Sequence, residues 1–172
     1  MSRRMNAERA FSVSTWLLAA AGDPTAARRQ WDSSGVAMLD CGKIFDAARV
    51  PAHLVHRVAG STDPDRITEY LDHALFGGAV IVDVQDEAYY FLVQHGASMR
   101  WNMPDTKCLG QGRSLGVPLP GASPRGGRRA RASWALEMFE PGALSVTGAV
   151  MQLVHHARLL WAQEERVEAS HG

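Results

Sequence analysis

Four aspartates stand at or beside the ends of predicted strands, where carboxylates could bind divalent metal ions. They are Asp40, Asp46, Asp83 and Asp86. Nucleotidyl transfer needs two or three carboxylates that converge on Mg²⁺ or Mn²⁺, because the ions hold the attacking and leaving oxygens together. Asp40, Asp83 and Asp86 are the candidate catalytic residues if neighbouring strands bring them together. The alternative is local, because aspartate is favoured at turns, where its side chain hydrogen-bonds to nearby backbone groups.

A second group of residues could bind nucleic acid. Four arginines, Arg125, Arg128, Arg129 and Arg131, fall within seven residues that include no acidic side chain. Guanidinium groups suit phosphate oxygens, and Trp101, in a predicted loop, could stack on a base. We therefore predict that these five residues bind nucleic acid. The alternatives are a solvated surface loop for the arginines and core packing for the tryptophan.

The motifs for a zinc site and for a phosphate-binding loop are weaker signals than the aspartate and arginine groups. His53 and His56 are three residues apart and share one side of a predicted helix. Cys41 and Cys108 could complete a zinc site with them, but only the histidine half is paired, so we predict no metal site and no cofactor. Gly110-Gln111-Gly112 lacks the Gly-Lys-Ser/Thr of a phosphate loop. Two widely separated cysteines are typical of a reduced, cytoplasmic protein.

The elements that would carry these residues are strands and helices in alternation. Predicted hairpins pair Val36–Asp40 with Lys43–Asp46 and Ala79–Val84 with Ala88–Val93, a strand pair lies within Thr106–Pro118, and a last strand spans Ser133–Phe139. Helices are predicted at 6–32 (an N-terminal group), 51–59, 63–76 and 143–167. Hairpins interleaved with helices predict an α+β fold: a single domain over 1–172, with helices packed on one face of a mostly antiparallel sheet.

Composition indicates a globular protein and excludes some partners. The chain has 172 residues, 46% of them hydrophobic, and a formal net charge of zero. A neutral chain has no overall field that attracts nucleic acid, so any such attraction needs a local patch. No run of about 18 apolar residues exists, so we expect no membrane span. The basic N-terminus precedes a short apolar run, but Glu8 and Ser12 argue against a signal peptide.

Three segments carry a resemblance to a known family. They are Ala88-Tyr89-Tyr90-Phe91, the Gly-rich segment Cys108–Gly112 leading to Val117-Pro118, and Trp134 after the next loop. Over roughly residues 35–134 this order resembles the N-terminal domain of bifunctional DNA primase/polymerases, especially short actinobacterial proteins. The resemblance implies a primase/polymerase-like fold that binds DNA.

The same resemblance implies that polymerase chemistry has been lost. The family's metal site is an Asp-x-Asp pair, whereas here Asp83-Val84-Gln85 has an amide in place of the second carboxylate. An amide cannot supply the negative charge that a divalent cation requires. The family's histidine corresponds to Tyr89 or Ala88, so its imidazole is missing as well.

We therefore predict a non-catalytic binding or regulatory domain whose partner is nucleic acid, a nucleotide or a protein. One alternative is an active nucleotidyl-transfer enzyme that uses Mg²⁺ or Mn²⁺ at Asp40, Asp83 and Asp86. Another is an interaction subunit that forms a homodimer through the apolar-striped helices at 6–21 or 143–167.

Overall fold

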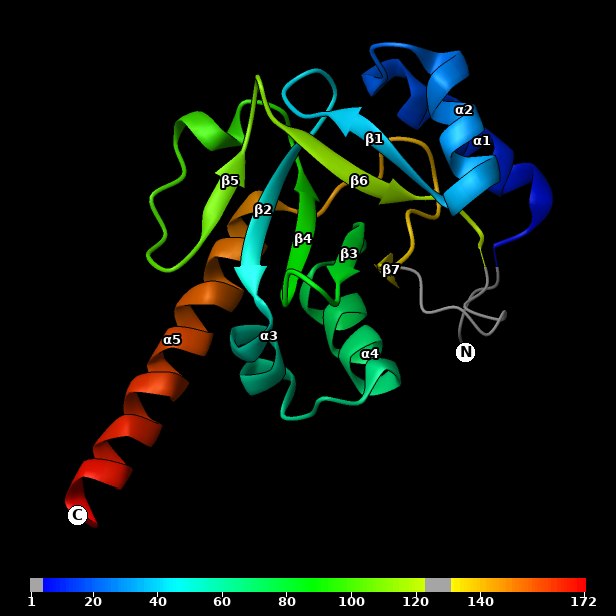
Figure 1. The fold of residues 1–172 in the computed structure, drawn as a ribbon. Helices are drawn as coiled ribbons and strands as arrows, with labels where there is room; N and C mark the ends of the chain where they lie inside the picture. Colours follow the sequence, from blue (N-terminus) through cyan, green and yellow to red (C-terminus); the bar gives the residue numbers. More distant parts are fainter. Residues whose placement is uncertain (1–4, 123–130) are drawn as a thin grey trace.

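Two antiparallel sheets form the centre of the computed structural model, which describes residues 5–122 and 131–172 (Figure 1). The larger sheet has the order β5 (Lys107–Leu109), β2 (Asp46–Pro51), β4 (Ala88–Val93), β3 (Val80–Asp83), β7 (Ala132–Leu136). The smaller sheet pairs β1 (Val36–Asp40) with β6 (Ser114–Pro118). The predicted α+β class with an antiparallel sheet is confirmed.

Helices precede, interrupt and follow the strands. They are α1 (Ala7–Leu17), η1 (Leu18–Ala20), α2 (Pro24–Ser34), α3 (Ala52–Ala59), α4 (Pro64–Ala74), η2 (Ala97–Met99) and α5 (Thr147–Ser170). Local signals explain where they begin: the Asn6 side chain accepts the Arg9 N–H at 2.7 Å, and Asp23 accepts the Ala26 N–H at 3.1 Å. Gly60 ends α3 in the left-handed conformation that favours glycine. None of the helices in the described parts of the chain is long and apolar enough to cross a membrane.

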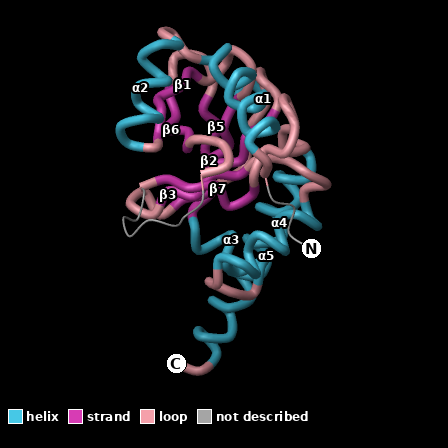
Figure 2. The backbone as a smooth tube through the Cα atoms, turned by 90° about the vertical axis from the view of Figure 1, so that its right-hand side faces the viewer, coloured by secondary structure: helices cyan, strands magenta, loops and turns pink. Residues whose placement is uncertain are grey.

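Both faces of the five-stranded sheet are covered (Figure 2). Tyr89, Phe91 and Val93 of β4 pack in the cluster that includes α3, α4 and α5, while Tyr90 and Leu92 pack in the cluster that includes α1, α2 and the two-stranded sheet. Every residue of β4 is buried. The expectation that helices cover a single face was wrong, because the continuous apolar run of β4 is typical of a strand buried on both sides.

Strand pairing confirms one predicted hairpin and corrects two. β3 and β4 form the hairpin, with Val80 opposite Phe91 and Asp83 opposite Ala88. β1 instead pairs with β6, and the predicted strand Lys43–Asp46 is a turn that leads into β2. β5 and β6 belong to different sheets. A Cβ added to Gly42 would lie 2.6 Å from the Gln111 backbone. The turn after β1 therefore packs closely against the Gly-rich segment Cys108–Gly112, where the chain crosses between the two sheets.

The C-terminal helix is buried along its first half, and its side-chain contacts with α3 extend to Glu164, which pairs with Arg57 at 2.9 Å. Buried α5 residues run from Val150 to Ala157, and beyond them Trp161 lies edge-on to His53 of α3 at a centroid distance of 4.9 Å. The last turns of α5 project away from the rest of the molecule (Figures 1 and 2). β5 and β7 are the two edge strands in the order of the five-stranded sheet, so the surfaces beside them lie at its opposite sides.

Candidate functional site

The structure brings two of the three candidate catalytic aspartates together. Asp83 ends β3 and Asp86 lies in the turn to β4, where the Asp86 N–H donates to Asp83 Oδ1 at 2.9 Å. Asp40 ends β1, where its carboxylate lies 2.9 Å from Lys43 Nζ. A short turn joins Asp40 to Asp46, which pairs with Val93 at the far end of β4. Five residue steps along β4 place that end about 16 Å from the β3–β4 turn, so Asp40 does not join the pair.

Asp83 and Asp86 are each bound to an arginine. Arg49 Nε donates to Asp86 Oδ2 at 2.9 Å, and Arg131 Nε donates to Asp83 Oδ2 at 3.2 Å. The Tyr90 hydroxyl also donates to the Asp86 carboxylate. The hydrogen bond from Arg49 lowers the pKa of Asp86, and burial together with Asp86 raises the pKa of Tyr90 to about 12. A divalent ion at this turn would have to compete with two guanidinium groups for the same oxygens.

Sequence reasoning did not identify Arg49 or Tyr90 as members of this cluster. They meet because β2 pairs with β4 in a register that places Arg49 directly opposite Tyr90. Forty residues separate these two partners along the chain, so no local pattern reveals the pairing.

The fourth aspartate, Asp46, is a buried structural residue. Its Oδ2 accepts the backbone N–H groups of Gly96 at 3.1 Å and of Ser98 at 2.8 Å, which holds the turn that begins η2. Its Oδ1 is buried and has no hydrogen-bond partner among the described residues. Burial, with Asp46 adding to it, raises the pKa values of Cys41 and Cys108 to about 12. Both thiols therefore stay protonated at neutral pH.

The two candidate histidines serve separate contacts. His56 Nε2 lies 3.1 Å from the Tyr89 hydroxyl, whereas His53 Nδ1 lies 2.7 Å from an Arg57 nitrogen. Burial lowers the pKa of each imidazole. Within residues 5–122 and 131–172, no three His, Cys, Asp or Glu side chains are grouped so that they could hold a metal ion.

A groove of about 530 Å³ lies beside the edge strand β5, and we call it the β5 groove. Among its lining residues are Ser98, Trp101, Asn102, Thr106, Lys107 and Arg113. Lys107 and Arg113 are exposed cations, and no described residue that lines the groove is acidic. The half-buried Trp101 is held by its Nε1–H, which donates to Thr106 Oγ1 at 2.9 Å. A fixed aromatic ring beside two cations suits a ligand that has both a planar base and phosphates.

A larger groove of about 1060 Å³ lies beside the opposite edge strand, and we call it the β7 groove. Four consecutive β7 residues, 132–135, line it. Its charged lining is mostly acidic: Asp65, Asp83, Asp86, Glu87 and Glu137, against Arg49. Glu137 Oε2 is buried without a hydrogen-bond partner among the described residues, and burial raises the pKa of Glu137 to about 7.

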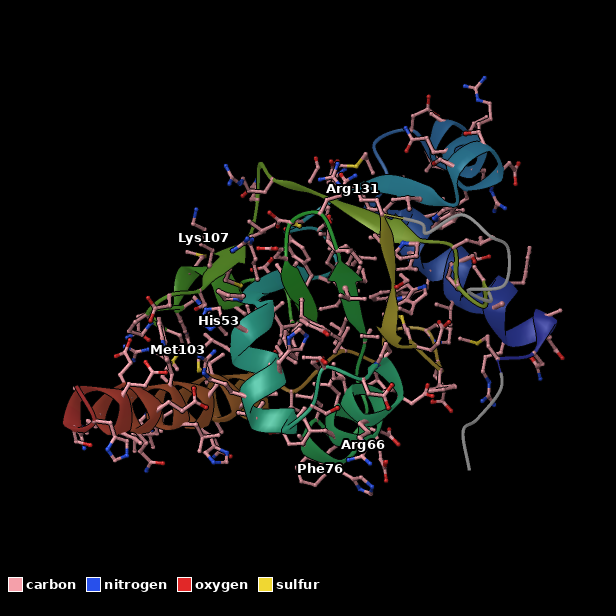
Figure 3. All side chains as sticks on the ribbon, turned by 60° about the horizontal axis from the view of Figure 1, so that its bottom comes forward. His53, Arg66, Phe76, Met103, Lys107 and Arg131 are labelled. Carbon is pink, nitrogen blue, oxygen red and sulfur yellow. The ribbon has the colours of Figure 1, made fainter. Side chains whose placement is uncertain are left out.

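The predicted nucleic-acid-binding residues do not form one described patch. Trp101 lines the β5 groove, whereas Arg131 precedes β7 at the other side of the sheet and is paired with Asp83. Figure 3 shows Lys107 and Met103 on the β5 side, away from Arg131. Arg125, Arg128 and Arg129 lie outside the described residues. Lys107 and Arg113 were not predicted, because isolated cations in sequence show no clustering until β5 and the turn before β6 meet.

Comparison with known proteins identifies no relative. No family model, curated protein or solved structure matches this chain. The resemblance to primase/polymerase domains therefore stays a prediction, and function is inferred from the two grooves and the ion-paired aspartates.

Proposed function

We propose that this chain is a non-catalytic domain that binds single-stranded nucleic acid in the β5 groove. The observation that carries this proposal is the lining of that groove, which includes Lys107, Arg113 and the half-buried Trp101 and no described acidic residue. Cations that neutralise phosphates supply sequence-independent affinity. An aromatic side chain adds stacking with any base, because every base has a π-face.

The fixed position of Trp101 supports stacking rather than a purely electrostatic contact. Thr106 Oγ1 accepts the indole N–H and itself donates to the Met103 carbonyl at 2.7 Å, so the loop holds the ring in one orientation. Preorganisation reduces the entropy that binding must overcome. A single strand is favoured over a duplex, since only unpaired bases can swing out onto an aromatic ring.

The cluster at Asp83 and Asp86 supports the absence of catalysis. Each carboxylate is neutralised by an arginine of the same chain, and Asp40 is bound to Lys43 at the opposite end of β4. Two-metal catalysis needs carboxylates that converge on ions about 3.5–4 Å apart. The resemblance to a primase/polymerase domain that lacks its acidic pair agrees with this proposal.

Binding is tested by fluorescence anisotropy with a labelled oligothymidylate. We expect a Kd on the order of 10⁻⁵ M that weakens steeply with salt, because phosphate contacts release counterions. Lys107→Ala and Arg113→Ala should each reduce the slope of log K against log salt by about 0.7. Arg66→Ala is the matched control, because Arg66 is an exposed cation on α4, away from the groove (Figure 3). An absence of binding at low salt, or an equal loss in the control, contradicts the proposal.

Catalysis is tested by nucleotide incorporation on a primed template with Mg²⁺ or Mn²⁺. We expect no product from the wild-type chain. Incorporation that disappears in Asp83→Ala but persists in Asp40→Ala would show that the β3–β4 turn is an active centre and would overturn the non-catalytic assignment.

A second candidate function is homodimerisation through the projecting part of α5. Leu159 and Val167 are 51% and 56% exposed and lie about two turns apart on this helix. On α1, the other helix with this predicted role, Phe11 is 64% exposed. Sedimentation velocity at micromolar concentration tests the candidate: a dimer that Leu159→Lys with Val167→Lys converts to a monomer supports it, and a wild-type monomer removes it.

A further inference from the structure

We propose that the β7 groove binds a basic, extended segment of a partner protein, which adds as a strand along β7. This site is separate from the β5 groove and does not depend on nucleic-acid binding. The two grooves flank opposite edge strands of the same sheet.

The first observation is that β7 is an edge strand of the five-stranded sheet. Within the described residues β7 pairs with β3 alone, and the Val84 N–H donates to the Arg131 carbonyl at 3.2 Å. Peptide groups alternate in direction along an antiparallel strand, so Arg131 and Ser133 face β3 while Ala132 and Trp134 face the groove. An edge strand of this kind can accept main-chain hydrogen bonds from an added strand.

The groove includes the length of this edge, and it also extends across β3 and β4 to β2, because Val82, Tyr89 and Arg49 line it as well. Residues 132–135 all line it, so a ligand in the groove lies alongside consecutive backbone groups. The register of β7 shifts at Ala135, which has no partner on β3. Its carbonyl accepts from Thr68 Oγ1 of α4 at 2.7 Å, so Thr68 occupies the edge at its far end. The position available to a ligand strand therefore begins beside Ala132 and ends at Thr68.

The charge of the residues that line the β7 groove indicates which kind of partner segment it can bind. The two arginines near the groove, Arg49 and Arg131, are already bound to Asp86 and Asp83. Asp65 at the start of α4 and Glu87 in the β3–β4 turn are exposed lining carboxylates. Among the described lining residues the unpaired charge that remains is negative, and complementary charge at an interface steers and orients its partner.

Glu137 adds a position that can accept one more donor. It follows β7 directly, lines the groove and has a buried oxygen without a hydrogen-bond partner among the described residues. A lysine or arginine side chain of the added strand can donate to that oxygen. A mobile polyamine could also neutralise the carboxylates, but it offers no carbonyl groups to pair with β7.

The first test compares three labelled octapeptides by fluorescence anisotropy at about 50 mM salt. Alternating lysine and valine should bind, and alternating glutamate and valine should not. A lysine–proline peptide of equal charge lacks half of the backbone donors, so we expect its affinity to be at least about tenfold lower. Equal binding of the proline peptide, or full displacement by equimolar spermine, would overturn strand addition. Absence of binding by the lysine–valine peptide would overturn the site.

The second test reverses the charge of the groove. Asp65→Lys with Glu87→Lys should weaken lysine–valine binding by at least about tenfold and create binding of the glutamate–valine peptide. Glu69→Lys with Asp72→Lys is the matched control, since these exposed α4 residues are not among the groove lining. Thermal unfolding of both double variants establishes that they are folded. Equal effects of the two reversals would contradict the site, because general charge alone would then account for binding. Oligothymidylate binding, measured in parallel, reports separately on the β5 groove.

Discussion

The two edges of the five-stranded sheet carry opposite charge in a chain whose net charge is zero. The β5 groove presents Lys107 and Arg113 beside an indole, whereas the β7 groove presents mainly carboxylates beside a strand edge. Overall charge therefore says nothing about partners here. A sheet with two distant edges lets one small protein separate a cationic surface from an acidic surface by the width of five strands.

One carboxylate near each groove has a buried oxygen without a partner among the described residues, and the two carboxylates differ in the donors that reach their other oxygen. Asp46, behind the β5 groove, accepts two backbone N–H groups. Glu137, in the β7 groove, has a buried oxygen that lacks a partner among the described residues. Asp46 stabilises a loop through two backbone donors, whereas Glu137 has the single Gly121 N–H, and burial raises its pKa to about 7, so its charged form is held at a cost in stability.

The largest expected effect among the tests of this contrast is the loss of stability in Asp46→Ala. Asp46→Ala leaves the Gly96 and Ser98 N–H groups without their acceptor in a fully buried position, so we expect a loss of about 3 kcal/mol in the free energy of unfolding. Urea unfolding measures it. Asp40→Ala, at an exposed ion pair, should cost less than about 0.5 kcal/mol. Similar losses in the two variants would mean that Asp46 does not support the β5 side.

Substitution of Glu137 should change the free energy of unfolding in the opposite direction from substitution of Asp46. Its folded-state pKa of about 7 lies above the unfolded value of 4.5, so the folded state holds the proton more tightly and loses stability as pH rises between these values. Glu137→Gln should therefore be neutral near pH 4.5 and stabilising by about 1–3 kcal/mol at pH 8. Thermal unfolding at both pH values checks this. A variant that is destabilised at pH 8 would show that the Gly121 N–H and its surroundings stabilise the charged carboxylate by more than burial destabilises it.

The ion pair between Arg49 and Asp86 should contribute less. The hydrogen bond from Arg49 lowers the pKa of Asp86 below its usual 3.8, so the stabilisation is present above that pH and is lost as pH falls through the lowered value. The Asp86 side chain is 34% exposed, which limits the coupling energy to about 1 kcal/mol at pH 7. A double-mutant cycle of Arg49→Ala and Asp86→Ala measures it. A coupling that persists at pH 2 would contradict an ionic origin.

The smallest expected effects give the most direct test of whether the two grooves bind their ligands independently. Lys107→Glu should weaken oligothymidylate binding a few-fold and leave lysine–valine peptide binding unchanged, whereas Glu87→Lys should do the reverse. Both residues are exposed, so stability should change by less than about 0.5 kcal/mol. Anisotropy titrations of both variants with both ligands give the four values. If either variant changed both affinities equally, the two grooves would not be independent.

Local chemistry made several elements predictable. Asn6 and Asp23 begin helices because their side chains accept nearby N–H groups, and the hairpin of β3 and β4 follows from two apolar runs around a polar turn. The placement of Trp101 in a loop was predictable for the same reason, since a short irregular segment separates two strands. Each of these features depends on residues within a few positions of one another.

Pairing between distant strands could not be predicted. The turn after Asp40 looked like a hairpin, yet β1 pairs with β6, about 80 residues later in the chain. A second non-local pairing, between β2 and β4, sets Arg49 against Tyr90 and Asp86, and it places Asp40 at the opposite end of β4 from Asp83. Two charged residues that a sequence spaces far apart can meet or remain separated, depending on a register that no local pattern encodes.

The amino-acid sequence by itself determined the α+β class, the beginnings of α1 and α2 and the central hairpin, because those depend on short-range hydrogen bonds and periodicity. The last helix, predicted from 143, begins only at Thr147 and has no side-chain cap. The tertiary structure alone decided which carboxylates are neutralised by arginine and which edge of the sheet is cationic or acidic. Coulomb energy depends on distance through space, and the distances between these charges are set by strand order rather than by position along the chain.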